Sequence, residues 1–221
     1  MAKLKKKTLD ELDLEILAIL HYKGKATATD LEKELEGKIT KAGISKRLKW
    51  LAEKGYLAKP INDISTGKLK RIYKAPSKEK LKSAFLEWYK TKIYEPITEA
   101  YIRDTETTLE EAYKEYPLEK AFKDDRINWL SLKNARELRK LREGVSLKEA
   151  VKILEDYSEL FGYEIAGLIT IKDGTVKLTK EGLEAVINEW IPEIKDKLTE
   201  LKELDFEAYK KLLSEFCKDL A

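Results

Sequence analysis

Apolar residues recur at helical spacing near the start of the chain. Thr8 or Asp10 can cap the first such stretch, which ends near Gly24. Its apolar face contains four residues: Leu9, Leu12, Ile16 and Leu20. The pattern predicts a helix, preceded by a basic arm over residues 1–7.

Two more short helices and a hairpin are predicted next. Thr27 can cap the second helix, with Asp30 in the place of a reciprocal capping acid. The third helix begins at Thr40 and ends at Gly55. The apolar positions of the two helices are Ala28, Leu31 and Leu35, then Ile44, Leu48 and Leu51. We expect the hairpin strands at residues 56–58 and 68–74, joined by a polar tip over 62–67.

Three short helices and a hairpin resemble a winged helix-turn-helix domain, as in PadR-like and ArsR-like archaeal and bacterial regulators. The residues that carry the resemblance are Ile-Leu-Ala-Ile-Leu at 16–20, Ala-Thr-Asp-Leu at 28–31 followed by Leu35, and the runs 44–57 and 66–73. The resemblance covers about the first third of the chain. It implies a DNA-binding domain at residues 1–76, with recognition helix 40–55 and wing 59–74.

Charge separates this segment from the rest of the chain. Residues 1–76 hold 18 Lys and Arg against 10 Asp and Glu, a net charge of +8. Residues 77–221 hold 26 against 31, a net charge of −5, so the total of +3 averages two unlike parts. The basic residues of the first part gather on the third helix and the hairpin, which favours a polyanionic partner. A Lys- and Glu-rich chain also carries such charges on solvated faces.

The third helix should bury its apolar stripe and turn its opposite side outward. Phosphate contacts would then dominate the affinity for DNA, with Ser45 and Arg47 nearest to base edges. The basic arm can follow a minor groove or remain a solubilising terminus. The predicted DNA-binding residues are Lys41, Ala42, Ser45, Lys46, Arg47, Lys49, Lys68, Lys70 and Arg71.

Residues 77–221 are expected to form a mostly helical domain with a short hairpin near 169–178. Asp173-Gly174 separates two alternating runs there, a strong hairpin signal. Two further helices are expected, from about 180 to 190 and from Pro192 to near 220. The predicted fold class is therefore mainly α with small β-hairpins, an N-terminal winged helix-turn-helix followed by a mostly helical domain.

Residues 146–182 also hint at a second winged-helix pattern, although an ordinary helix–hairpin–helix subdomain fits them too. The helix in the recognition position carries Glu159 and Glu164 and no Lys or Arg. Such a surface repels phosphate. We therefore expect a packing or protein-contact unit here.

An aromatic stripe follows the predicted wing, with Phe85, Trp88, Tyr89 and Tyr94. It admits three interpretations: plain core, a dimer seam, or the lining of an apolar effector pocket. A helix that leaves a wing commonly dimerises in this class, so a homodimer through the helical domain is expected. No cluster of polar residues along this stripe indicates a binding site for a small-molecule effector, so the sequence does not support an effector.

Few side chains are available for other chemistry. The single His21 and single Cys217 exclude a Cys/His zinc cluster, an internal disulfide and an iron–sulfur site. We expect a surface or capping role for His21 and a core role for Cys217. No glycine-rich phosphate loop is present. We predict no catalytic residue, no metal and no cofactor; a metal nuclease at Glu164, Asp173 and Lys177 would rest on spacing that arises by chance.

The sequence contains neither a signal peptide nor an apolar run of about 18 residues, so we expect a cytoplasmic, nucleoid-associated protein without membrane contact. Abundant Lys and Glu and the absence of Gln are typical of a thermophile, and we expect an archaeal source. The predicted function is a transcriptional regulator that binds double-stranded DNA. The alternative is an architectural, replication or plasmid/viral partition protein that uses the same DNA reader without promoter control.

Overall fold

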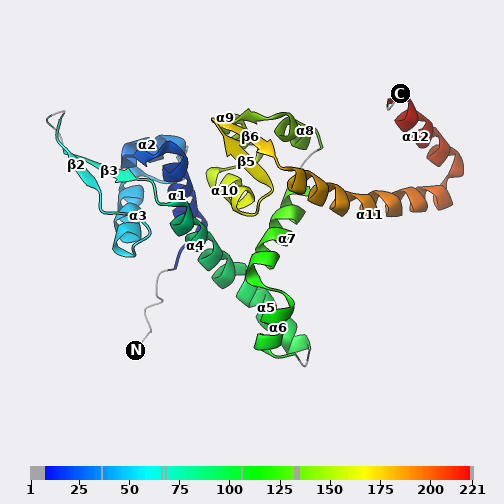
Figure 1. Ribbon diagram of the computed structural model, residues 1–221, viewed down its shortest axis with the longest axis horizontal. Helices are drawn as coiled ribbons and strands as arrows, with labels where there is room; N and C mark the ends of the chain where they lie inside the picture. Colours follow the sequence, from blue (N-terminus) through cyan, green and yellow to red (C-terminus); the bar gives the residue numbers. More distant parts are fainter. Residues whose placement is uncertain are drawn as a thin grey trace.

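Helices dominate the structure, and they carry two small three-stranded antiparallel sheets (Figure 1). The coarse prediction of a mainly α fold with small β-hairpins is confirmed. The computed structural model describes residues 8–35, 37–65, 67, 69–105, 107–131 and 135–219, without the side chains of 135, 136, 190, 193 and 215–219.

The first sheet belongs to an N-terminal unit, which we call the first unit. Its elements are α1 (Glu11–Lys23), β1 (Lys25–Ala26), α2 (Ala28–Glu34), α3 (Lys41–Glu53), β2 (Ile61–Asp63) and β3 (Lys70–Lys74). Asp10, Thr27 and Thr40 cap the three helices, as predicted. Their hydroxyl or carboxylate oxygens accept backbone N–H groups that the first helical turn leaves without partners.

The hairpin of the first unit differs from the prediction in two ways. Its first strand lies at 61–63 and not at 56–58, because the N–H groups of Tyr56 and Leu57 donate to the carbonyl of Leu51 and complete the end of α3. The chain leaves α3 through Gly55, whose φ of +83° lies in the left-handed region. The sheet also contains the unpredicted strand β1, which pairs Ala26 with Tyr73 and gives the order β1-β3-β2.

A second unit repeats this topology. Its elements are α8 (Ala135–Glu143), β4 (Val145–Ser146), α9 (Leu147–Ile153), α10 (Tyr157–Ile165), β5 (Ile169–Lys172) and β6 (Thr175–Leu178). The strand order is β4-β6-β5, the same as in the first unit. Asp173 and Gly174 both have positive φ, so the predicted hairpin closes with the tight turn that their sequence favours.

Local features at the helix ends match between the two units. Gly24 and Gly144, both with positive φ, follow α1 and α8, and each is succeeded by a two-residue strand and a seven-residue helix. Gly55 and Gly167 follow α3 and α10 in the same conformation. The N–H of Leu168 donates to Tyr163 just as that of Tyr56 donates to Leu51. This correspondence places Phe161 of α10 at the position that Lys49 holds in α3.

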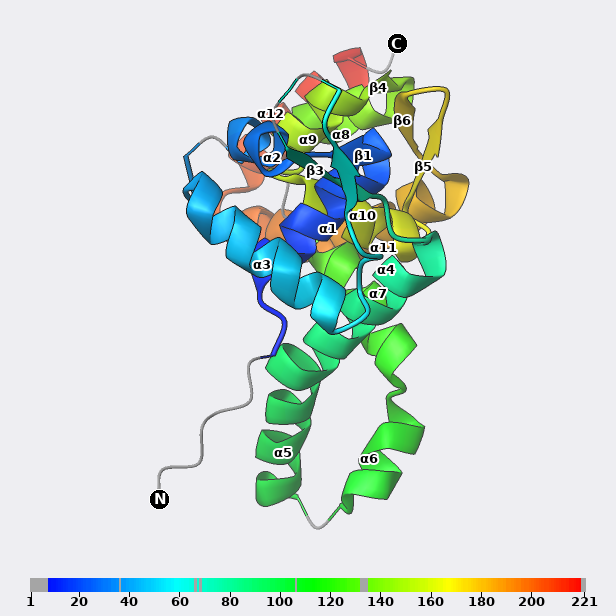
Figure 2. The same ribbon diagram turned by 90° about the vertical axis from the view of Figure 1, so that its left-hand side faces the viewer.

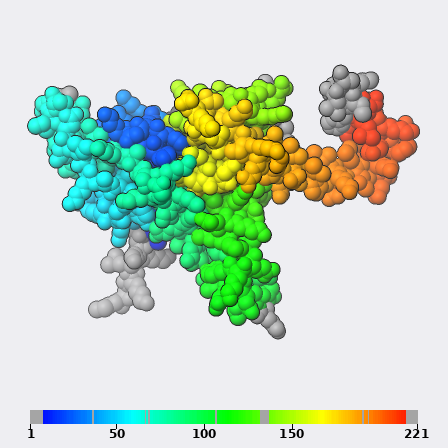
Figure 3. Space-filling view, viewed as in Figure 1, coloured from blue at the N-terminus to red at the C-terminus, as the bar shows by residue number. Residues whose placement is uncertain are grey.

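Helices outside the two units connect them and form two projecting arms (Figures 2 and 3). The connecting helices are α4 (Lys78–Tyr89), the π-helical turn η1 (Lys90–Tyr94) and α7 (Leu118–Ser131). One arm is the pair α5 (Glu95–Asp104) and α6 (Leu109–Glu115); the other is the far half of α11 (Lys180–Leu204) with α12 (Phe206–Asp219).

The predicted interruption at Pro192 is wrong, because α11 runs through this residue to Leu204 and Asp205 caps its end. Proline removes the donor for the carbonyl four residues earlier, that of Asn188. Asn188 is exposed, so water can satisfy that carbonyl. Asp205 is extended instead, and its carboxylate accepts the N–H of Ala208 at 2.9 Å and starts α12.

The aromatic stripe after the hairpin is core. Phe85, Tyr89 and Tyr94 are buried, and the half-buried Trp88 packs against the cores of both units. This burial supports the plain-core interpretation for Phe85 and Tyr89, whereas Tyr94 also lines a groove with Ile97 and Tyr101. The dimer-seam and effector-pocket interpretations stay predictions.

Candidate nucleic-acid interface

The orientation of α3 is fixed by three buried side chains. Ile44, Leu48 and Leu51 are fully buried against the first unit. Because a helix presents opposite faces about two residues apart, the remaining positions turn to solvent. The exposed predicted residues of α3 are Lys41, Ala42, Ser45, Lys46 and Lys49.

A groove of about 620 Å³ lies where α3, the start of α2 and β3 meet. Four predicted DNA-binding residues line it: Lys41, Ser45, Lys70 and Arg71. The start of α2 contributes Thr29 and Asp30, which were not predicted from the sequence. The structure thus brings the two basic elements to one open concave surface. Lys68 and the basic arm lie outside the described residues.

Carboxylates near the groove are held by backbone and hydroxyl donors. Asp30 accepts the N–H and the hydroxyl of Thr27 at 2.8 and 2.7 Å, and these bonds lower the pKa of its carboxyl. Glu32 accepts the N–H of Lys41 at 2.8 Å, at the first turn of α3. Asp30 therefore caps the start of α2, and Glu32 accepts a backbone donor at the start of α3.

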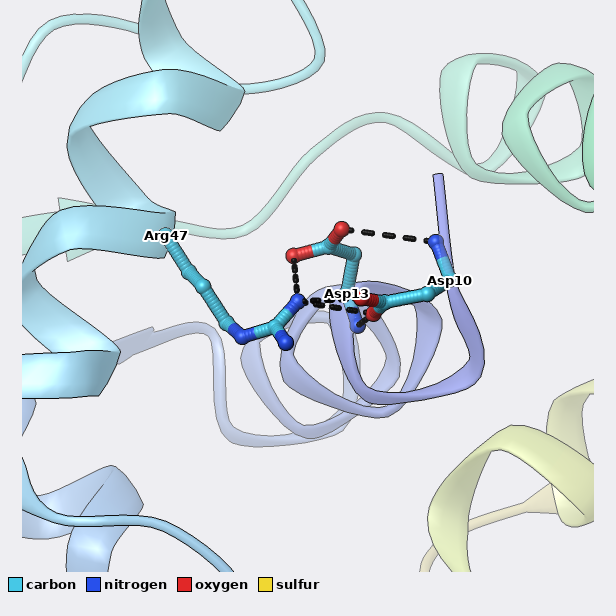
Figure 4. A network of polar contacts seen from close by, with 3 residues as sticks. All are labelled: Asp10, Asp13 and Arg47. Atoms are coloured by element: carbon cyan, nitrogen blue, oxygen red, sulfur yellow. Dashed lines mark hydrogen bonds and ion pairs between the residues drawn. The ribbon is translucent and has the colours of Figure 1, made fainter. Parts of the chain in front are cut away.

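Arg47 is held inside the first unit (Figure 4). Its Nη1 donates to both carboxylate oxygens of Asp10 and to Oδ1 of Asp13, each at 2.7 Å. Asp13 is fully buried, and the Arg47 side chain is only 22% exposed. Partial burial opposes ionisation of Asp10, but the Arg47 hydrogen bond, the Asp13 N–H and the Arg47 charge lower the pKa of its carboxyl below the ordinary value. The guanidinium ties α3 to the start of α1, so it is the one predicted residue of α3 that is not on the open face.

Two apolar residues on the hairpin were not predicted from the sequence. Ile64 is 71% exposed and Leu69 is 60% exposed, on either side of the hairpin tip. Apolar side chains that stand in an otherwise polar turn were the available signal. Such residues can wedge against sugar edges or base steps when a hairpin enters a minor groove.

The second unit offers no equivalent surface, because α10 packs against the first unit. Phe161 is fully buried in the core of the first unit, 5.3 Å from the ring of His21 and 5.0 Å from that of Phe85. His21 is therefore half-buried between the units and takes no capping bond.

Two polar contacts flank this apolar centre. The Tyr22 hydroxyl donates to Glu164 at 2.9 Å, and Lys78 pairs with the same carboxylate at 2.5 Å. The Tyr157 hydroxyl donates to Glu34 at 2.9 Å, and Lys23 pairs with that carboxylate at 2.8 Å. Burial, followed by the facing carboxylate, raises the pKa of both tyrosines.

The nuclease hypothesis gains no support from this arrangement. Glu164 is occupied by Tyr22 and Lys78, and Asp173 forms the β5–β6 turn. Within the described part of the chain, no three His, Cys, Asp or Glu side chains gather as a metal site would require. The Cys217 side chain lies outside the described residues.

The length and apolar character of the helices show whether any of them could span a membrane. No described helix is both long and apolar enough to cross a membrane.

The chain matches none of the protein-family models, curated proteins or solved structures with which it was compared.

Proposed function

We propose that the protein binds duplex DNA with the first unit, used as a winged helix-turn-helix, and acts as a transcriptional regulator. In this proposal α3 is the recognition helix and β2–β3 is the wing. The observation that carries the proposal is the groove that joins Lys41 and Ser45 of α3 to Lys70 and Arg71 of β3.

The dimensions and charge of this surface suit DNA. A major groove about 12 Å wide admits one helix, and the exposed cations of α3 and β3 can then neutralise phosphates on both sides. Ser45, on the outward side of α3, is the candidate for a base-edge contact. Arg47 is reassigned from base reading to holding the angle between α3 and α1, because its Nη1 pairs with Asp10 and Asp13 and its side chain is mostly buried.

The test is the salt dependence of DNA binding by the full chain. We expect the Lys70→Ala/Arg71→Ala variant to bind duplex more weakly. The slope of log K against log salt should flatten by about 0.9 for each phosphate that the variant no longer neutralises. Fluorescence anisotropy on a duplex selected from a random library measures both quantities.

A matched control is available on the second unit. Lys172 and Lys177 lie on β5 and β6, both exposed, and Lys172→Ala/Lys177→Ala removes the same charge. We expect this control to keep the slope of the wild type. Equal weakening by the two variants would show that general charge, and not this groove, attracts DNA, and would overturn the proposal.

The alternative is an architectural or coating protein that binds DNA with the same first unit. The two arms with exposed apolar residues favour it, since contacts between molecules would spread along DNA. A footprint separates the two functions: one protected palindrome supports the regulator, and protection that extends cooperatively from one site supports the coating protein.

A further inference from the structure

Exposed apolar side chains concentrate on the two arms that project from the body. Ile97 and Tyr101 on α5 are 64% and 46% exposed, and Ile191 and Ile194 on α11 are 54% and 52% exposed. Scattered single exposures are ordinary, but contiguous patches mark contacts with other molecules. Figure 3 shows both arms projecting from the body of the molecule.

The α11 arm has the spacing of a helix that packs along another helix. Ile187, Ile191, Ile194, Leu198 and Leu201 follow a 4-3-4-3 pattern. α12 folds back over the last two, which are half-buried, and leaves the first three exposed. Between α11 and α12 lies a groove of about 480 Å³, lined by Ile191, Ile194, Leu198 and Tyr209. The groove leaves room for one more amphipathic segment.

The charges at this groove select an acidic occupant. Lys195 and Lys202 line it, and no described carboxylate does. If two copies of α11 packed on a twofold axis, each flanking lysine would face another lysine. Like charges opposed across an interface are unfavourable, so the groove suits a different, acidic helix.

The α5–α6 arm has the required features. Residues 95–116 contain seven Asp and Glu against two Lys and Arg. Ile97 and Tyr101 lie one turn apart on α5, Asp104 continues the same face, and Glu115 of α6 stands beside them. Lys120 lines the same groove, and its ammonium lies over the ring of Tyr116, 5.3 Å from the ring centroid.

We propose that the α5–α6 arm of one molecule docks into the α11–α12 groove of a second copy of this chain. Ile97 and Tyr101 contact Ile191 and Ile194, and Asp104 and Glu115 stand opposite Lys195 and Lys202. The two surfaces differ, so the contact is heterologous: it closes into a small ring or reciprocal dimer, or continues as a filament. Any effect of this contact on DNA binding rests on the proposed function; the self-association does not.

The experiment is sedimentation velocity of the full chain without DNA, from 1 to 100 μM. We expect the wild type to associate over this range. Lys195→Glu/Lys202→Glu and Asp104→Lys/Glu115→Lys should each associate at least tenfold more weakly when alone. An equimolar mixture of the two variants should recover association, because each groove then meets an arm of opposite charge.

Several outcomes would overturn the inference. They are a wild type that stays monomeric to 100 μM, an Asp104→Lys/Glu115→Lys variant that associates as the wild type does, or a mixture that is not rescued. Lys172→Glu/Lys177→Glu, which makes the same charge change on β5–β6, should associate normally, and circular dichroism verifies that each variant is folded. Absent association with intact DNA binding would remove only this inference, and the reverse result would remove only the proposed function.

Discussion

The first and second units share one topology but use the corresponding helix in opposite ways. In the first unit α3 turns Ser45, Lys46 and Lys49 to solvent. In the second unit the matching positions of α10 are Tyr157, Ser158 and Phe161, and this face is packed against the first unit. The same backbone framework therefore supports an open basic surface in one case and an internal contact in the other.

The residues next to these faces show how each helix is held. Arg47 of α3 pairs with Asp10 and Asp13 of α1. Its counterpart in α10 is Glu159, which pairs at 2.8 Å with the buried Arg126 of α7. The position is basic in α3 and acidic in α10, and its partner lies on a different helix in each case. An ion pair at this position therefore anchors each helix, but with the charges reversed. Topology thus sets where a helix lies, whereas a few side chains decide whether its outer face stays open to solvent or fills a core.

The largest expected difference in stability is between alanine variants of Phe161 and Lys49, which occupy matching positions in the two units. We expect Phe161→Ala to lower the free energy of unfolding by about 4 kcal/mol, since a buried phenyl ring is removed and a cavity remains. Lys49→Ala should change it by less than about 0.5 kcal/mol, because Lys49 has only an exposed pair with Glu53. Urea unfolding measures both; similar decreases would mean that the two faces do not differ as described.

The second-largest effect is expected from removing Arg47, the side chain that anchors α3 to the start of α1. Arg47→Ala should cost about 3 kcal/mol, because it takes a charged partner away from the fully buried Asp13. The matching change Glu159→Gln should cost less, since Asp125 still pairs with Arg126 at 2.7 Å. Lys46→Ala, one residue from Arg47 and exposed, is the control. A smaller destabilisation by Arg47→Ala than by Glu159→Gln in urea unfolding would contradict the comparison.

The anchor also has a pH dependence. The pKa of Asp10 is lowered in the folded protein, so its contribution is fully present above the ordinary value of 3.8 and disappears as the pH falls through the lower folded pKa. The stability advantage of the wild type over Arg47→Ala should therefore narrow below about pH 4. Thermal unfolding of both proteins between pH 3 and 7 tests this; a constant difference would exclude an ionic contribution.

The smallest effect concerns the two tyrosine contacts between the units. Tyr22→Phe and Tyr157→Phe should each cost about 1 kcal/mol, the net value of one hydrogen bond. DNA affinity should stay unchanged, because both hydroxyls bond across the two units and neither tyrosine lines the groove. Tyr101→Phe on the exposed arm serves as the control for urea unfolding. Weaker DNA binding by either variant would place the unit contact inside the proposed interface.

Much of the local structure was predictable because its signals act over three or four residues. Asp10, Thr27 and Thr40 cap helices, and Asp173-Gly174 turns a hairpin, through bonds to near neighbours. Strands β1 and β4 are two residues long and exist only through pairing with β3 and β6, far along the chain. The continuity of α11 through Pro192 depends on solvent at Asn188, which periodicity does not report.

For the candidate site, the sequence determined which segments are basic and which residues of α3 are apolar. This was enough to propose the exposed face with Lys41, Ser45, Lys46 and Lys49. Only the tertiary structure decided that Arg47 turns to α1, that α10 is covered by the first unit, and that the aromatic stripe is core. The reason is physical: a side chain's spacing fixes its angle on a helix, but its partner is fixed by whichever element packs against that angle.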